Sequence, residues 1–119
     1  MKKVLIIDDE ERIRAIYKRV CMALGNEICE VFEAADAVTA TNILIRESVD
    51  LILLDIRMPG INGQTMFEVI REYTPDVDVI IASVFPVYQQ RELFPQAKDY
   101  YDKSQGPFVL LDKLANVLL

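Results

Sequence analysis

The sequence predicts an α/β fold, in which helices cover both faces of a parallel five-stranded sheet. Short apolar runs of four or five residues recur along the chain. Each is followed by a longer segment whose apolar residues fall at three- and four-residue steps, the spacing of an amphipathic helix. Strands that alternate with helices form parallel sheets joined by right-handed crossovers. The 119 residues fit one domain, 1–119, without an internal linker or repeat.

The first half of the chain predicts three strands and two helices. Residues 4–7 are all aliphatic, as is typical of a strand buried on both faces. Residues 11–23 form a helix, ended by Gly25, whose apolar positions are Ile13, Ile16, Tyr17, Val20 and Leu24. A weaker strand pattern at 28–32 precedes a helix at 36–46. Residues 51–54 are the clearest strand, and it ends at Asp55.

The second half continues the alternation. A turn at Met58-Pro59-Gly60 precedes a helix at 64–73, which Thr74-Pro75 ends. A strand is expected at 77–82, a short helix at 87–94 and a short strand at 99–101. A last helix, 107–118, has proline in its first turn.

The last helix has more apolar residues than one core contact needs. One face carries Phe108, Leu111, Ala115 and Leu118, and the apolar surface is widened by Leu110, Leu114, Val117 and Leu119. Two interpretations stay open at this point. The helix is either a well-buried terminal helix, or it presents a surface to a partner protein or to a second copy of the chain.

Composition excludes several classes of function. The net charge of −6 argues against direct binding of nucleic acid, which depends on Lys and Arg. The absence of histidine excludes Ser-His-Asp triads, histidine-ligated zinc and phosphohistidine carriers. The apolar run at the start is too short for a signal peptide, and no stretch is long enough to span a membrane. Cys21 and Cys29 are expected to be reduced and mostly buried in a cytoplasmic protein.

Polar residues gather where the predicted strands end. Three carboxylates, one hydroxyl and one ammonium group follow four of the five strands: Asp8, Asp9, Asp55, Ser83 and Lys103. Taken singly, each has an ordinary structural explanation as a helix cap, a turn residue or a solvated charge. In an open parallel sheet, however, the carboxyl ends of the strands form the ligand-binding edge.

The combination of these residues favours a metal-assisted phosphoryl chemistry. Carboxylates held close together raise one another's pKa unless a cation lies among them. Oxygen ligands at an exposed edge suit Mg²⁺, which binds a few carboxylates together with a phosphate. A nearby lysine supplies charge to hold the oxygens of a transferred phosphoryl group.

These residues resemble those of response-regulator receiver domains of two-component systems over essentially the whole chain. The matching pieces are residues 7–10 (IDDE), 53–63 (LLDIRMPGING), 82–83 (AS) and 99–103 (DYYDK), of which the second is the most specific. The resemblance implies a flavodoxin-like, doubly wound sheet with strand order 2-1-3-4-5 and five helices. It implies a cytoplasmic signalling protein that assists its own phosphorylation and dephosphorylation, rather than a conventional enzyme.

The resemblance also implies roles for individual residues. Asp55 would accept a phosphoryl group from a sensor histidine kinase or a phosphotransfer protein. Mg²⁺ (or Mn²⁺) would be held by Asp9, Asp55 and the backbone carbonyl of Arg57, with Asp8 binding directly or through water. Lys103 would pair with Asp55 and then with the phosphoryl oxygens. Ser83 would move onto the phosphoryl group and let Tyr100 swing inward, which would change the surface of the last helices for an output domain or effector protein.

The chain departs from the family pattern around the switch segment. Ser104 stands where a proline in a cis peptide bond usually follows the lysine, and Val84 replaces a small residue, where it would crowd phosphoryl access. The stretch from Ser83 to Tyr100 is a couple of residues short, and prolines bracket its helix. We expect Phe85 to shield the phosphoryl group from water, so that autodephosphorylation is slow.

Two other functions are consistent with parts of this pattern. An aspartyl-phosphate hydrolase of the haloacid dehalogenase type would have a second aspartate two residues after its nucleophile, where this chain has Arg57. A degenerate receiver that serves only for protein contacts would explain Ser104 and Val84, but its site residues would not need to stay chemically intact. No DNA-binding or catalytic output segment is recognised within residues 1–119.

Overall fold

The computed structural model describes residues 1–119 and contains one parallel sheet with strand order β2-β1-β3-β4-β5. In chain order its elements are β1 (Lys2–Ile7), α1 (Glu11–Met22), β2 (Cys29–Ala34), α2 (Ala37–Arg46), β3 (Leu51–Asp55), α3 (Gly63–Tyr73), β4 (Asp78–Ser83), α4 (Val87–Leu93), β5 (Asp99–Asp102), the 3₁₀ helix η1 (Lys103–Gln105) and α5 (Pro107–Leu118). The expected flavodoxin-like fold and strand order are therefore confirmed.

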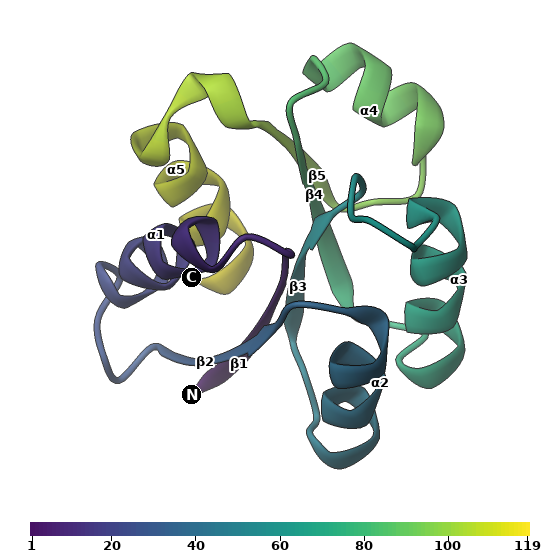
Figure 1. Cartoon of the computed structure of the whole chain (residues 1–119). Coiled ribbons are helices and arrows are strands. Elements are labelled where there is room, and N and C mark those ends of the chain that lie inside the picture. The colour runs from purple at the N-terminus through teal and green to yellow at the C-terminus, as the bar shows by residue number, and fades with distance from the viewer.

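The helices form two layers around the sheet. Helices α1 and α5 lie on one face, and α2, α3 and α4 lie on the other (Figure 1). Each face has its own hydrophobic core, because alternate residues of a strand point to opposite sides. Ile7, Ile52 and Leu54 belong to the core beneath α2 and α3, whereas Leu53 and Ile80 pack towards α1 and α5. This double burial explains why the central strands are continuous aliphatic runs.

Capping residues set the start of two helices. The side chain of Asp36 accepts the backbone N–H of Thr39 and begins α2 one residue later than the pattern predicts. Asn62 accepts the N–H groups of Gln64 and Thr65 at the start of α3. Gly63 stands there because a Cβ atom would lie 2.9 Å from the carbonyl oxygen of Ile56. The loop after β3 can therefore pass close beneath α3.

Several strand boundaries differ from the predicted ones by one or two residues. The first strand was predicted at 4–7 but begins at Lys2. The second strand was predicted at 28–32, but β2 runs to Ala34 because its register with β1 continues until Ile7 pairs with Ala34. The fourth strand was predicted at 77–82 and lies one residue later. The 3₁₀ helix η1 was not predicted. Its first turn is held by Asp102, which accepts hydrogen bonds from the backbone N–H and the hydroxyl of Ser104.

The apolar face predicted for the last helix is only partly correct, since Leu118 is buried and Leu111 packs against the core but Phe108 does not. The residues of α5 that reach the core are Leu110, Leu114 and Leu118, whereas Phe108 is 81% exposed. Two apolar stripes lie side by side on this helix, and the one that faces the sheet is set by packing against α1 and β5. Phe108, in the first turn, projects away from that contact.

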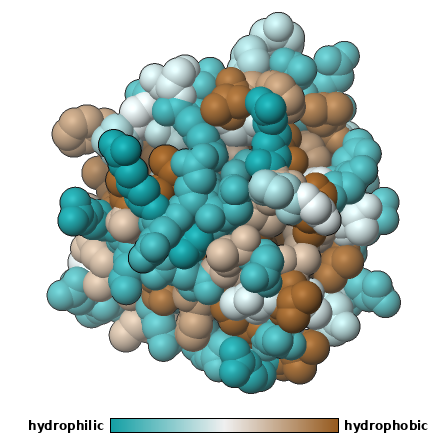
Figure 2. Space-filling view, in the orientation of Figure 1, coloured by the Kyte–Doolittle hydropathy of each residue, from teal (hydrophilic) through white to brown (hydrophobic).

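The remaining sequence expectations concern the cysteines and the surface. Cys21 on α1 and Cys29 on β2 are both buried free thiols, and burial raises the pKa of the Cys21 thiol to about 12. Hydrophilic side chains cover much of the face drawn in Figure 2, and hydrophobic ones lie in separate patches. None of the helices has the length and apolar character needed to cross a membrane.

Candidate functional site

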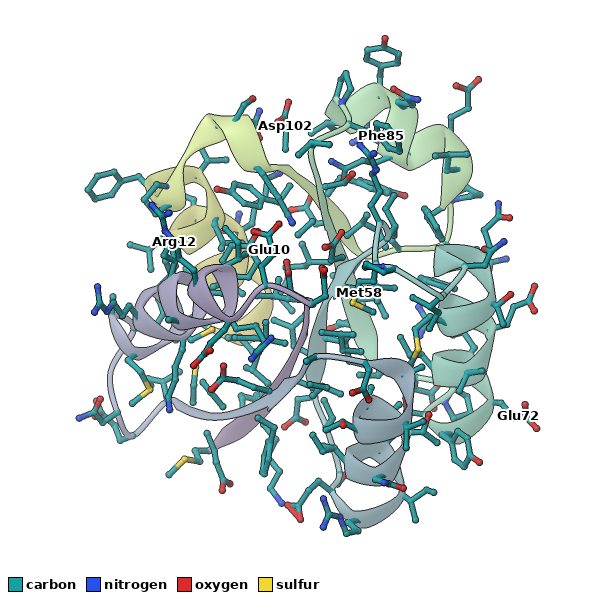
Figure 3. The ribbon with its side chains drawn as sticks, viewed as in Figure 1. Glu10, Arg12, Met58, Glu72, Phe85 and Asp102 are labelled. Atoms are coloured by element: carbon teal, nitrogen blue, oxygen red, sulfur yellow. The ribbon has the colours of Figure 1, made fainter.

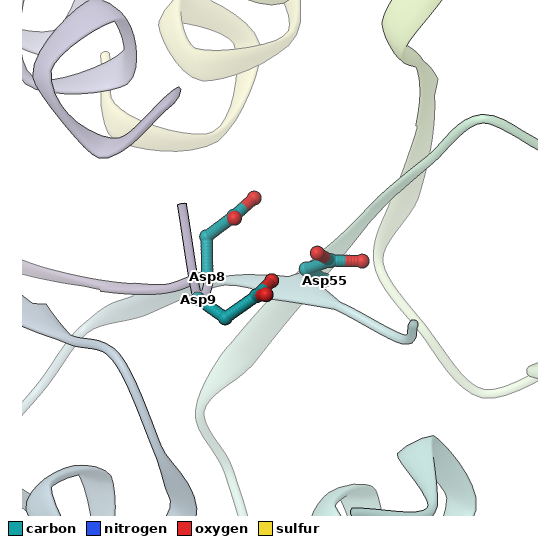
Figure 4. Close-up of side chains that lie close together, drawn as sticks. All are labelled: Asp8, Asp9 and Asp55. Carbon is teal, nitrogen blue, oxygen red and sulfur yellow. The ribbon is translucent and has the colours of Figure 1, made fainter. Parts of the chain in front are cut away.

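Three aspartates converge at the carboxyl edge of the sheet. Asp8 and Asp9 directly follow β1, and Asp55 is the last residue of the neighbouring strand β3 (Figure 4). Each offers a carboxylate oxygen, and these three oxygens lie within 4.8 Å of one another. Asp8 and Asp55 are buried, 1% and 6% exposed, while Asp9 is open to solvent. The convergence predicted from the sequence is present.

Lys103 reaches the same cluster from the end of β5. Its Nζ lies 3.1 Å from Oδ2 of Asp8 and 3.4 Å from Oδ2 of Asp55. The ammonium group therefore bridges both buried carboxylates, whereas the sequence suggested a pair with Asp55 alone. The structure has no cis peptide bond, so the bond between Lys103 and Ser104 is trans. In this chain the lysine reaches its partners without the usual proline.

The turn role considered for Asp55 also holds, whereas Asp8 closes a turn and does not cap α1, whose N-cap residue Glu10 makes no side-chain capping bond. Oδ1 of Asp8 accepts the backbone N–H of Glu10 at 2.9 Å, and Oδ1 of Asp55 accepts that of Arg57 at 2.9 Å. Each carboxylate thus closes a short turn with one oxygen and faces Lys103 with the other. These turns fix the orientation of both side chains.

The site is electrostatically coupled. Burial raises the pKa of the Asp55 carboxyl, although the N–H of Arg57 and the charge of Lys103 act in the opposite direction. Burial by itself lowers the pKa of Lys103, but the carboxylates of Asp55 and Asp8 outweigh it, and the net shift is upward. Lys103 is therefore protonated at neutral pH, and the fully ionised cluster has an excess of negative charge.

Sequence reasoning missed an arginine that holds the backbone of the site. Nη1 of Arg14, on α1, donates to the backbone carbonyl of Asp8 at 2.8 Å, and its Nε donates to Glu33 of β2 at 3.3 Å. The N–H of Asp8 in turn donates to the carbonyl of Ala34. Arg14 does not belong to the apolar stripe of its helix, so the pattern that identified α1 carried no signal for this role.

Ser83 and Phe85 line the site from the end of β4. Ser83 is buried, and its hydroxyl oxygen accepts the backbone N–H of Phe85 at 3.2 Å. Phe85 lies on the loop before α4, opposite the β3–α3 loop that carries Met58 (Figure 3). The guanidinium of Arg57 lies 5.2 Å from the centre of the Phe85 ring. This cation–π contact joins the loop that follows β3 to the loop that follows β4.

Tyr100, a proposed switch residue, and Val84, which follows the other switch residue Ser83, lie in different surroundings. Tyr100 is buried, and its hydroxyl donates to the carbonyl of Phe94 at the end of α4. It therefore already occupies an inward position, which the resemblance associates with the switched arrangement. Val84 is largely exposed and turns its side chain towards solvent.

The donor set fits a hard divalent cation. Asp9 is exposed and has no hydrogen bond that a metal ion would have to break, and Asp55 lies beside it. Both oxygens of Asp8 are already engaged, by the N–H of Glu10 and by Lys103. Carboxylate oxygens at a partly solvated edge match the preference of Mg²⁺, which keeps several water ligands.

Comparison with known proteins agrees with the fold and the site together. Residues 4–115 match the response regulator receiver domain family. The chain belongs to this family. The receiver domain is 29% identical over 98 residues to sporulation initiation phosphotransferase F of Bacillus subtilis, which covers 82% of the chain and 74% of that protein.

Solved structures give the same result. Response regulator protein TrrA from Thermotoga maritima, in complex with Mg²⁺ and beryllium fluoride, is 30% identical and aligns with a TM-score of 0.84 over 99% of this chain and all of that one. Chemotaxis protein CheY4 of Vibrio cholerae, 24% identical, aligns with a TM-score of 0.86 over 99% of each chain and shows the same fold.

Several relatives are longer than this chain. The receiver domain spans 48% of a probable transcriptional regulator, ycf27, of Porphyridium aerugineum, to which it is 32% identical over 119 residues and 98% of its own length. It spans 26% of a protein-glutamate methylesterase/protein-glutamine glutaminase of Azospirillum brasilense. The chain therefore matches only part of the length of each of these two relatives.

Proposed function

We propose that the receiver domain accepts a phosphoryl group on Asp55, donated by the phosphohistidine of a sensor kinase or of a phosphotransfer protein. The observation that carries this proposal is the convergence of one ammonium group and three carboxylates at the strand ends. Asp55 is the only one of the three that both ends a strand and faces Lys103 with a carboxylate oxygen not used in its turn.

The side chains around Asp55 have separate tasks in this reaction. A carboxylate is a weak nucleophile, so the site must stabilise the charge that moves onto the phosphoryl oxygens in the transition state. Lys103, at 3.4 Å, supplies positive charge directly beside the attacking group. The N–H of Arg57 orients the carboxylate through Oδ1. Ser83 ends β4, the strand next to β3, and its hydroxyl would donate to a phosphoryl oxygen.

A divalent cation, Mg²⁺ or Mn²⁺, belongs to this proposal. Asp9, Asp55 and the backbone carbonyl of Arg57 would hold it, with Asp8 acting through water because Lys103 and Glu10 occupy its oxygens. When bound, the cation neutralises negative charge on the phosphoryl group and on the carboxylates. Ser83 and Tyr100 remain the proposed switch residues, and a change in the last helices would reach an output domain or effector in the cytoplasm.

The test is intact-protein mass spectrometry after incubation with acetyl phosphate and Mg²⁺. We expect one added phosphoryl group when Mg²⁺ is present and none when EDTA replaces Mg²⁺ during the incubation. Peptide mapping after borohydride reduction should localise the group to Asp55. An adduct on another residue would refute the assignment. If no adduct forms with acetyl phosphate or with a phosphorylated sensor kinase as donor, the domain is a degenerate receiver that acts through protein contacts.

Phe85 is predicted to slow the loss of the phosphoryl group. Its ring is in contact with the guanidinium of Arg57, two residues after Asp55, and we expect this pair to restrict the approach of water to the acceptor. Phe85→Ala should therefore shorten the half-life of the phosphorylated protein severalfold, as followed by mass spectrometry after removal of the donor. Tyr88→Ala, an exposed aromatic in the same segment, should leave it unchanged. A wild-type half-life of seconds would contradict the prediction.

We also propose that the exposed start of α5 is a contact surface for a partner protein. Phe108 projects into solvent at the start of this helix, where an output domain, an effector or a second copy of the chain would find an apolar contact. Light scattering with and without beryllium fluoride tests the homodimer. A mass equal to one chain in both conditions would exclude it.

A further inference from the structure

Helix α4 is attached to the domain differently from the other helices. Each of α1, α2, α3 and α5 buries at least two large apolar side chains, whereas the one fully buried residue of α4 is a glutamine, Gln90. This helix has only seven residues, and no side chain caps its start. A helix this short has little intrinsic stability. Its position therefore depends strongly on what Gln90 contacts.

Gln90 joins two segments that are not adjacent in sequence. Its Nε2 donates to the backbone carbonyl of Phe85 at 2.7 Å and to that of Tyr101 at 2.9 Å. Both acceptors are carbonyls, so the amide must present its NH₂ group to them, and this fixes its orientation. Its Oε1 is buried and has no donor. A buried acceptor without a partner destabilises the folded state, so the amide nitrogen of Gln90 is well bound but its oxygen is not.

Each of these two carbonyls is two residues in sequence from a residue of the proposed site, Ser83 or Lys103. Phe85 donates its N–H to the hydroxyl of Ser83, and its C=O, in the next peptide unit, accepts from Gln90, so one residue connects the proposed switch residue to α4. Tyr101 is in β5, two residues before Lys103, and pairs in register with Ala82 of β4. Ser83, α4 and β5 are thus joined through one amide group.

We propose that Gln90 is a positioning residue that transmits a displacement of Ser83 to α4 and β5. The proposal rests on the proposed function, because phosphorylation of Asp55 supplies the displacement. When Ser83 moves towards a phosphoryl oxygen, its hydroxyl releases the N–H of Phe85. The backbone of Phe85 then shifts, and the amide of Gln90 follows the Phe85 carbonyl. A cavity of about 180 Å³ beside Phe85, also lined by Ile56 and Leu93, leaves room for this movement.

This route links the site to the helix without requiring Tyr100 to rotate. Tyr100 is already buried and bonded to the carbonyl of Phe94, so it holds the end of α4 in place. Gln90 acts one turn earlier, at the part of the helix nearest the site. A helix held at its end by Tyr100 and near its start by a half-satisfied amide is suited to pivot about the fixed end.

Hydrogen exchange measured by mass spectrometry tests the proposal, with Mg²⁺ and beryllium fluoride as the phosphoryl analogue. In the wild type we expect the analogue to change exchange at Ser83–Phe85, throughout α4 and in β5. Gln90→Met keeps the length and helix preference of the side chain but removes both donors. We expect it to retain the response at Ser83–Phe85 and to lose most of the response in α4 and β5.

Gln89→Met is the matched control, since Gln89 makes no side-chain hydrogen bond, and it should respond like the wild type. A response in α4 that is equal in Gln90→Met and wild type would overturn the coupling and leave the proposed function intact. Absence of any response in the wild type would overturn both. If Gln90→Met does not fold, NMR of the wild type decides: the side-chain amide signals of Gln90 must shift when the analogue is added, and unshifted signals refute the proposal.

Discussion

Lys103→Met is expected to lower the rate of Asp55 phosphorylation by acetyl phosphate about 100-fold or more, the usual effect of removing one preorganised charge from a transition state. The methionine side chain fills similar space but leaves the attacking carboxylate without the ammonium group that lies 3.4 Å away. The rate is measured as the growth of the phosphoryl adduct by intact-protein mass spectrometry at saturating Mg²⁺.

A second lysine provides the control for this experiment. Lys113 also forms an ion pair with an aspartate, Asp99 at 3.2 Å, but it lies on α5 away from the acidic cluster. Lys113→Met should phosphorylate at the wild-type rate. If Lys103→Met keeps a rate within a few-fold of the wild type, the lysine serves the resting structure rather than the reaction. Its contact with Asp8, at 3.1 Å, would then be its main role.

The site was predictable from the sequence because it depends on strand ends. A buried aliphatic run marks a strand, the residue after it lies at the edge of the sheet, and parallel strands bring those edges together. This reasoning places Asp8, Asp55 and Lys103 in one cluster without any knowledge of side-chain conformations. It does not give the partner of each charge, so the bridge from Lys103 to both buried carboxylates became visible only in the structure.

Residues that act through the backbone were not predictable in the same way. Arg14 binds a carbonyl oxygen, and Gln90 binds two. Carbonyl groups are present at every position, so no residue pattern indicates which one is bound. A partial signal existed for Gln90, which takes an inward position between Val87 and Phe94 at helical spacing. A polar residue in such a stripe marks a buried hydrogen bond.

The apolar surface of α5 shows the limit of periodicity. Leu110, Leu114 and Leu118 are spaced four residues apart, and a second apolar series lies one residue further along the helix. Both series satisfy the same helical pattern, so which of them is buried depends on the tertiary contact of α5 with α1 and β5. Phe108 is exposed because the other series faces the core, and nothing in the neighbouring sequence indicates this.

Asp55→Asn is expected to abolish the phosphoryl adduct, because an amide nitrogen cannot form an acyl phosphate. Asp76→Asn, an exposed aspartate at the opposite end of the sheet, should phosphorylate normally. Asp55→Asn also has an effect on stability whose sign follows from the raised pKa of its carboxyl. A folded domain with a raised carboxyl pKa binds more protons than the unfolded chain between the two pKa values, so stability falls as the pH rises through the folded-state pKa.

The stability that Asp55 contributes is therefore fully present below its ordinary pKa of 3.8 and is lost above the raised value. At neutral pH and with EDTA present, the asparagine variant should be more stable than the wild type by on the order of 1 kcal/mol in urea unfolding. As the pH is lowered through the raised pKa of Asp55, the wild type should gain stability relative to the variant, because groups that titrate equally in both proteins cancel in this comparison.

Divalent metal should reverse this order of stability. A ligand that binds only the folded state stabilises it by about 2.7 kcal/mol at a concentration 100 times its dissociation constant. The wild type has the carboxylate of Asp55 to bind Mg²⁺, whereas the variant offers an amide oxygen that already accepts the N–H of Arg57. With saturating Mg²⁺ the wild type should therefore become the more stable protein. If the variant stays more stable at every Mg²⁺ concentration, Asp55 is not a metal ligand, and the acidic cluster is held together by Lys103 alone.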